Sequence, residues 1–461
     1  MRRFELVLCI ILCLAATDAG AQKLTVVGDR FLVDGTPRFL TFVTYFGGMG
    51  APNINQDLRL IRSLGFDGIR LWPNLDTGPQ LMNGDGSLRS DELKRFLQIL
   101  DQAKLERLIV DVSFTYEHIR GMTPSTARIG IENVTQAVRS YDNLLFDIQN
   151  ERNVNDRRFM SGTDVSRIYT AVKAIDPARI TFADNAPVDT PEYAAQFTAT
   201  YGLDVTAYHE PRPGNWYTLP VTEAIVSALR VVGKPVYLQE PMSTRDDLFG
   251  YPSQDRAEYF LQAIAHAKLT GAAGWCFHTE VGVDFRTGAP FFEDRLRAYP
   301  EPEWAFVSSL SPRLVLRANN GVHYLVAEGG GGSGVRADRT AAGPGSWDTF
   351  NAISLSGGPL LSGDRVALAT NDGKHYLQAV NGGGGALRAL STTIGAAETF
   401  IIEKTGGGII RHGDTISLRV ADASWFVSAE NGGGGNVSAN AAARGAWETF
   451  TLLFTTPHIT P

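Results

Sequence analysis

The chain has 461 residues, of which 44% are hydrophobic and 20% charged, and its net charge is −7. This length suffices for two or three domains of roughly 150 residues each, or for one barrel and a smaller module. The composition is typical of a globular protein. Binding to phosphate backbones needs clustered Lys and Arg, and the sequence has no such cluster, so we do not expect nucleic acid as a partner.

The N-terminus has the pattern of a secretory signal. Arg2 and Arg3 form its positive start, residues 6–16 its apolar core, and Ala19-Gly20-Ala21 a small-x-small cleavage site. The apolar core is shorter than the ~20 residues that a membrane-spanning helix needs. We therefore expect residues 1–21 to be removed, the protein to be secreted or periplasmic, and the membrane not to be a partner.

Removal of this signal would leave Cys276 as the single cysteine of the mature chain, so that no internal disulfide could form. Stability would then depend on burial of a core, which a chain of this length permits. Cys276 stands in the apolar run Gly274-Trp275-Cys276-Phe277, and we expect it to be a small buried hydrophobe.

Short apolar runs alternate with amphipathic helical stretches over residues 22–310. The predicted strands are Phe39–Tyr45, Gly68–Trp72, Leu108–Phe114, Leu144–Glu151, Ile180–Asp184, Asp204–His209, Val236–Glu240 and Gly274–His278. This alternation predicts an α/β fold, a closed parallel (β/α)8 TIM barrel. An open doubly wound sheet is the alternative, but no Gly-x-Gly-x-x-Gly turn follows an early strand. A hairpin over residues 24–33 is expected to cap the barrel floor.

A different pattern occupies residues 311–461. Three units repeat an aromatic residue, a run of four glycines and a closing Thr-Phe pair, and the closing residues are Phe350, Phe400 and Phe450. Three units are too few for an open solenoid, so we predict closure into an all-β β-trefoil with threefold pseudosymmetry. The repeats resemble the fascin-like branch of β-trefoils, except that Ala397 replaces the Trp of the other two units. Such a domain would either bind carbohydrate or be a structural appendage.

Two carboxylic acids follow predicted strands of the barrel. Asn150-Glu151 ends the fourth strand, and Glu240 ends the seventh, 89 residues after Glu151. In a parallel barrel the C-terminal ends of the strands carry the active site. Side chains from strands 4 and 7 can both reach its centre, so a gap of roughly 5 Å is attainable, as retaining glycoside hydrolysis requires. Glu210, Glu280 and Asp284 are competing acids at the rim.

These residues, with Gly35-Thr36-Pro37 before the first strand and the second strand Gly68–Trp72, resemble clan A glycoside hydrolases and family 5 in particular. The resemblance implies that Glu151 is the acid/base and Glu240 the nucleophile. The residues that it implies for substrate binding are Asn150 at the sugar 2-hydroxyl, Arg70 beside Glu240, Tyr208 and His209 at the end of strand 6, and Trp275 as an aromatic face for the sugar. Tyr208 and His209 are adjacent, so alternation directs only one to the axis, although we expect both to line the cleft.

The leading hypothesis is a secreted retaining glycoside hydrolase that acts on a β-linked polysaccharide or oligosaccharide, a β-glucan or a β-mannan. We expect no cofactor and no metal ion, and a monomer. Two alternatives stay open. One is a glycan-binding or adhesion protein with an inert barrel; the other is a transglycosylase, because a sugar can take the place of water at the covalent intermediate.

Overall fold

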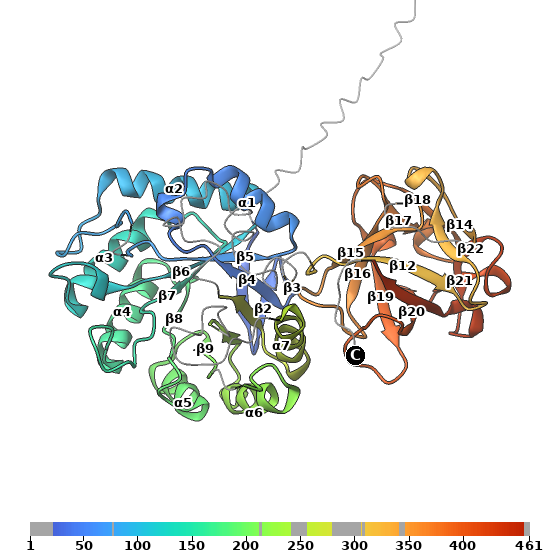
Figure 1. The fold of residues 1–461 in the computed structure, drawn as a ribbon. Helices are drawn as coiled ribbons and strands as arrows, with labels where there is room; N and C mark the ends of the chain where they lie inside the picture. Colours follow the sequence, from blue (N-terminus) through green and yellow to red (C-terminus); the bar gives the residue numbers. More distant parts are fainter. Residues whose placement is uncertain are drawn as a thin grey trace, which may run out of the picture.

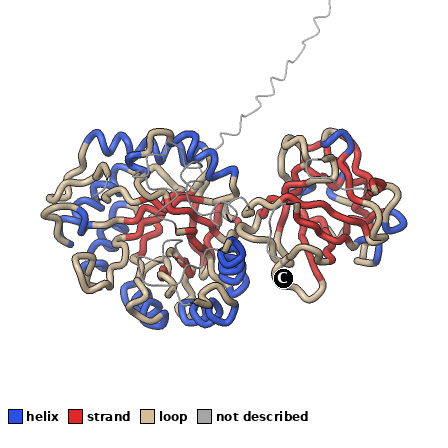
Figure 2. The backbone as a smooth tube through the Cα atoms, in the orientation of Figure 1, coloured by secondary structure: helices blue, strands red, loops and turns tan. Residues whose placement is uncertain are grey.

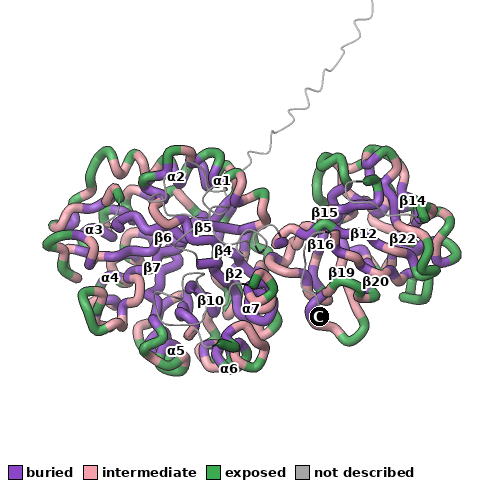
Figure 3. Tube along the Cα trace, viewed as in Figure 1, coloured by how far each residue is buried: buried purple, intermediate pink, exposed green. Residues whose placement is uncertain are grey.

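A computed structural model describes residues 22–75, 78–211, 214–240, 256–278, 306, 309–340 and 346–455. The predicted signal, residues 1–21, lies outside the described residues. The described residues form two separate hydrophobic cores, one between Leu24 and Phe306 and one between Leu314 and Phe454. Figure 1 shows the barrel and the β-rich part beside each other, and Figure 3 shows buried residues at the centre of each. Within the described ranges, no helix is long and apolar enough to cross a bilayer.

Eight parallel strands form the sheet of the barrel, in the order β8-β7-β6-β5-β4-β11-β10-β9. They are β4 (Leu40–Thr44), β5 (Gly68–Leu71), β6 (Ile109–Ser113), β7 (Leu144–Asp147), β8 (Ile180–Phe182), β9 (Thr206–Tyr208), β10 (Val236–Leu238) and β11 (Gly274–Phe277). The chain segments at β8 and β9 are joined by backbone hydrogen bonds from Asp204 to Thr181 (3.1 Å) and from His209 to Asn185 (2.9 Å), which close the ring. All eight predicted strands are present, each shorter than predicted.

Helices connect successive strands and surround the sheet, as Figure 2 shows. They are α1 (Ile54–Ser63), α2 (Ser90–Leu105), α3 (Pro124–Ala137), α4 (Gly162–Ile175), α5 (Pro191–Tyr201), α6 (Leu219–Arg230) and α7 (Ala257–Thr270). The bounds of α5 follow from its sequence. Thr190 accepts a hydrogen bond from the backbone of Tyr193, Pro191 occupies the first turn, and Gly202 ends the helix at a φ of 66°.

A small antiparallel sheet of β1 (Leu24–Val27), β2 (Arg30–Val33) and β3 (Thr36–Pro37) precedes the barrel. The backbone N–H of Leu24 donates to the carbonyl of Asp142, two residues before β7, at 2.9 Å. The hairpin therefore lies at the N-terminal ends of the strands, where the sequence predicted a cap for the barrel floor.

Twelve antiparallel strands form the β-rich part. They are β12 (Arg313–Ala318), β13 (Tyr324–Ala327), β14 (Ser333–Arg339), β15 (Phe350–Ser354), β16 (Arg365–Ala369), β17 (Tyr376–Ala379), β18 (Gly385–Ser391), β19 (Phe400–Lys404), β20 (Thr415–Val420), β21 (Phe426–Ala429), β22 (Val437–Ala441) and β23 (Phe450–Phe454). Strands β12, β15, β16, β19, β20 and β23 pair into a closed ring. The other six form three hairpins, which pair with one another through β14, β18 and β22. Each sequence repeat thus supplies four strands.

The glycine runs of the repeats form the turns of these hairpins. Gly330, Gly383 and Gly433 have φ angles of 80°, 117° and 129°. L-residues with a side chain rarely adopt these angles, whereas glycine adopts them readily. The repeated glycines are therefore explained by the backbone, as the sequence predicted.

The β-rich part is attached to the floor side of the barrel. The guanidinium of Arg38, which precedes β4, donates to the carbonyl of Leu355 at 2.9 Å. The ammonium of Lys268, near the end of α7, donates to Asp364 at 2.6 Å, and both side chains are nearly buried. These contacts lie at the end of the barrel opposite to the strand ends that carry Glu151 and Glu240.

Candidate active site

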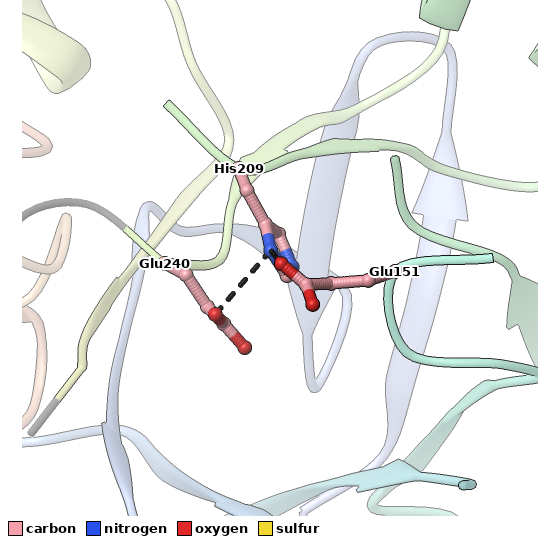
Figure 4. Close-up of side chains that lie close together, drawn as sticks. All are labelled: Glu151, His209 and Glu240. Carbon is pink, nitrogen blue, oxygen red and sulfur yellow. Dashed lines mark ion pairs between the residues drawn. The ribbon is translucent and has the colours of Figure 1, made fainter. Parts of the chain in front are cut away.

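The site is formed where β5, β7, β9 and β10 end. Arg70 lies in β5, Glu151 follows β7, His209 follows β9 and Glu240 follows β10. One carboxylate oxygen of each glutamate and a ring nitrogen of His209 lie within 4.8 Å of one another. Figure 4 shows the imidazole of His209 close to both carboxylates. The structure thus brings together the two glutamates that the sequence singled out.

Glu240 accepts a hydrogen bond from Arg70 and lies close to two histidine rings. Arg70 Nη1 lies 2.5 Å from Glu240 Oε1, and His209 Nδ1 lies 3.3 Å from Oε2. His278 Nε2 is 3.9 Å from the same Oε2. The side chain of Glu240 is 10% exposed. The contact with Arg70 is the one expected of a group that stabilises a carboxylate anion.

Arg70 is the centre of a buried polar network. It has no exposed surface, and its guanidinium donates to Ser113 Oγ at 2.8 Å, Asn150 Oδ1 at 2.7 Å and Asp184 Oδ2 at 2.9 Å. The ring centroid of Trp72 lies 4.5 Å from the guanidinium carbon. Burial disfavours the cation, but four carboxyl groups outweigh burial and raise the pKa of Arg70 well above its ordinary value. Arg70 is therefore a permanent cation.

Three aspartic acids without exposed surface surround Arg70. Burial raises the pKa of Asp111 to about 6, although the charge of Arg70 opposes this. Burial, reinforced by the charge of Asp184, raises the pKa of Asp147 well above its ordinary value. Burial also acts on Asp184, but His209 and Arg70 lower the pKa of its carboxyl group. Asp184 is therefore the ionised member of the pair.

His209 contacts three carboxylates at once. Its Nε2 lies 3.0 Å from Asp184 Oδ2, and its Nδ1 lies 3.4 Å from Glu151 Oε1, besides the contact with Glu240. Burial favours the neutral ring, but Asp184 and Glu240 raise the pKa of His209 to about 10. The ring is therefore an imidazolium at neutral pH. Although the three groups lie close enough to hold a metal ion, such an ion would first have to displace the proton from His209.

Glu151 sits in a strained turn after β7. Its φ angle is 51°, which is uncommon for a residue other than glycine. The backbone N–H of Glu151 donates to Asp184 Oδ1, which holds this conformation in place. Its side chain is 20% exposed and forms an ion pair with Arg158 Nη1 through Oε2. Such conformations persist where the surroundings enforce them, often at functional sites.

Two of the predicted substrate-binding residues do not reach the site. Tyr208 is buried on the other face of the strand, where its hydroxyl donates to the carbonyl of Asp189 at 3.0 Å. Because successive side chains of a strand alternate, only His209 points to the axis. Trp275 has no exposed surface and packs against Phe306, with ring centroids 5.7 Å apart. A ring that is buried on both sides cannot stack on a sugar.

Several residues of the site were not assigned from the sequence. Asp184, His278 and Trp72 each end a predicted strand, and this position at the rim of the barrel could have identified them as site residues. The ring centroids of Trp72 and His278 lie 6.2 Å apart, so these residues form one wall beside Arg70. Arg158 belongs to an irregular loop, and no feature of the local sequence distinguishes it from other surface arginines.

No protein-family model matches the chain, and no curated protein matches it. Similar solved structures include a glycoside hydrolase family 5 protein from Bacteroides vulgatus, with 12% identity over 86% of this chain and 92% of that chain and a TM-score of 0.49. A β-mannanase from Thermomonospora fusca has 17% identity over 56% and 84% of the two chains, with a TM-score of 0.43. A β-mannanase from the blue mussel Mytilus edulis has 13% identity over 56% and 92%, with a TM-score of 0.42. At such low similarity, function has to be argued from the site itself.

Proposed function

We propose that the protein is a retaining glycoside hydrolase that cleaves O-glycosidic bonds of a β-linked polysaccharide, a β-glucan or a β-mannan. The observation that carries this proposal is the pair Glu151 and Glu240 at the strand ends, with one carboxylate oxygen of each within 4.8 Å of the other. Retaining enzymes hold their two carboxyl groups about 5–5.5 Å apart, whereas inverting enzymes leave about 6.5–9.5 Å for a water molecule. The spacing favours double displacement.

The surroundings of the two glutamates suit different roles. Glu240, held by Arg70, is the nucleophile that forms a glycosyl–enzyme ester. Glu151 is the more exposed of the two, and it protonates the leaving oxygen and then activates water. Asn150 accepts from Arg70 through Oδ1, which leaves its amide nitrogen to donate to the 2-hydroxyl of the sugar.

His209 serves this mechanism as a positioning residue. Its imidazolium contacts both glutamates and is fixed from behind by Asp184. When Glu240 forms an ester, its negative charge is lost and that of Glu151 appears as the proton leaves. A cation that touches both carboxylates stabilises the charge at either end of this transfer.

We also propose the organisation of the whole chain. Residues 1–21 are a cleaved signal, residues 22–310 the catalytic barrel and residues 311–461 a fascin-like β-trefoil, and the protein is a secreted or periplasmic monomer. The closed ring of six strands and the three mutually paired hairpins support the trefoil. Its attachment at the barrel floor keeps it away from the cleft.

The test is release of reducing ends from soluble glucan, mannan and xylan, with the anomeric form of the first product followed by proton NMR. We expect the β anomer from a β linkage. Glu240→Gln should lower kcat by a factor of about 10³ or more, since the nucleophile is lost. Glu223→Gln, at an exposed position of α6, is the matched control and should be unchanged. Activity that survives Glu240→Gln would overturn the proposal, and an inverted product would overturn the retaining mechanism.

A further inference from the structure

The ion pair between Arg158 and Glu151 conflicts with the role of a general acid. A general acid must present a protonated oxygen to the leaving group. Oε2 of Glu151 contacts the guanidinium of Arg158, and Oε1 faces His209 Nδ1 at 3.4 Å. An oxygen that accepts from a guanidinium has neither a proton nor space for the leaving oxygen. Arg158 must therefore move before Oε2 of Glu151 can meet the leaving oxygen.

Arg158 is the cation that can move. Its side chain is 32% exposed, whereas that of His209 is 2% exposed and braced by Asp184. Arg158 is also held from the solvent side by Asp156, at 3.0 Å from Nε to Oδ1 and 2.6 Å from Nη2 to Oδ2. The guanidinium can thus leave Glu151 without losing its other partner.

Arg157, the residue before Arg158 in the chain, lines a pocket. This pocket of about 430 Å³ lies between two loops and is lined by Glu117, His118, Arg120, Gly121 and Arg157. The loops are tied together where Arg157 Nη2 donates to the backbone carbonyl of Glu117.

The exposed charged residues that line this pocket are arginines. Arg120 and Arg157 are exposed, whereas Glu117 is buried. Burial raises the pKa of Glu117, although a hydrogen bond from Gln149 opposes this. Asp156 is already engaged by Arg158. The exposed rim of this pocket is therefore cationic, in a chain with a net charge of −7.

We infer that the substrate carries an anionic substituent, a carboxylate or a sulfate ester, on the leaving-group side, and that Arg158 determines this specificity. The inference rests on the proposed function and narrows its substrate class. The anion takes over the guanidinium of Arg158 and so releases Oε2 of Glu151 for the leaving oxygen. Arg120 and Arg157 supply further attraction at the mouth. A neutral chain lacks the group that draws Arg158 away.

The experiment measures binding to the full chain that carries Glu240→Gln, so that no turnover is needed. The probes are unsubstituted, carboxymethylated and sulfated forms of a soluble β-1,4-glucan and of a soluble β-1,4-mannan, titrated by tryptophan fluorescence at low and high salt. We expect at least one anionic form to bind about tenfold more tightly than its neutral parent. Comparing the two anionic forms tells a carboxylate site from a sulfate site. High salt should weaken the preference.

Variants of Arg158 test whether this residue binds the anionic substituent. Arg158→Gln should remove most of the preference, and Arg158→Lys should keep part of it, because lysine retains the charge but not the planar fork. Arg167→Gln removes an exposed arginine of α4 and should change nothing. In the chain with Glu240 intact, Arg158→Gln should raise kcat/KM on neutral substrate several-fold, which a merely structural residue would not do. Circular dichroism checks that each variant is folded.

Equal binding of neutral and both anionic forms would overturn the inference, as would a preference that survives Arg158→Gln. These outcomes are independent of the outcome for the hydrolase itself. Activity that persists in Glu240→Gln removes the proposed mechanism, whatever the binding shows. If Glu240→Gln abolishes activity but neutral and anionic polysaccharides bind equally, the protein is a hydrolase that acts on neutral chains.

Discussion

Arg70→Met should destabilise the barrel in a manner that depends on pH. Arg70 has no exposed surface and lies 2.5 Å from Glu240 and 2.9 Å from Asp184. Removing one partner of a buried ion pair costs about 3–5 kcal/mol, because it leaves an uncompensated charge. The loss near pH 8 should therefore be about 3–5 kcal/mol.

The loss should shrink in acid. In the variant, Asp184 and Glu240 keep the contact with the His209 imidazolium but lose the one with Arg70, so the folded state favours their charged forms less than it does in wild type. Carboxylates ionise above a pH of about 4, so this difference is present only above that pH. The difference from wild type therefore grows as pH rises from about 4 to about 8 and is small at the acid end.

The assay is hydrogen exchange with mass spectrometry of peptides from β4 to β11, as a function of urea near pH 5 and near pH 8. Following exchange in the barrel peptides alone measures unfolding of the barrel core separately from unfolding of the β-rich part. The control Arg167→Met removes an exposed ion pair and should change the free energy of unfolding by less than about 1 kcal/mol at both values. A loss below about 1 kcal/mol, or one that is equal at both pH values, would refute the reasoning.

Three further variants test other parts of the structure. Burial raises the pKa of Glu210 to about 8, so wild type should lose stability as pH rises from about 4.5 to about 8. Glu210→Gln should therefore unfold at a higher urea concentration than wild type near pH 8 and at the same concentration near pH 4.5. Equal urea midpoints at both pH values would contradict this. Trp275→Phe should cost about 1–3 kcal/mol through the cavity that it leaves, with KM unchanged, whereas a tenfold rise in KM would restore the ring to the cleft. Lys268→Met should leave Asp364 without its cation and weaken docking of the β-rich part on the barrel by about 3–5 kcal/mol. Solution scattering should then show a larger radius of gyration. An unchanged radius would show that the other contacts are enough to hold the two parts together.

The strands and the repeats could be read from the sequence because periodicity is a local property. Buried parallel strands appear as short apolar runs, and each of the eight predicted runs contains a strand of the barrel. The glycine runs were equally clear, since each turn needs positive φ. Glu151 and Glu240 followed from the same logic, because a polar residue that ends a buried strand lies at the rim.

The same local signals failed where the direction of a side chain mattered. For Tyr208 and His209, alternation showed that the two diverge but not which one faces the axis. The run Gly274–Phe277 is apolar throughout, so its pattern does not tell the inner face from the outer. Pairing of β11 with β4 and β10 decides that face, and it directs Trp275 away from the site.

By itself, the sequence determined the order and type of the elements and the pair of acids at the strand ends. Only the tertiary structure decided which charges share one buried space. Arg70 meets Asp147 and Asp184 across 77 and 114 residues of chain, and closure of the ring brings them together. The same closure surrounds His209 with the carboxylates that keep it protonated, and it brings Arg158 into contact with Glu151. Electrostatic interactions depend on distance and burial, and neither is encoded by the neighbours of a residue in the chain.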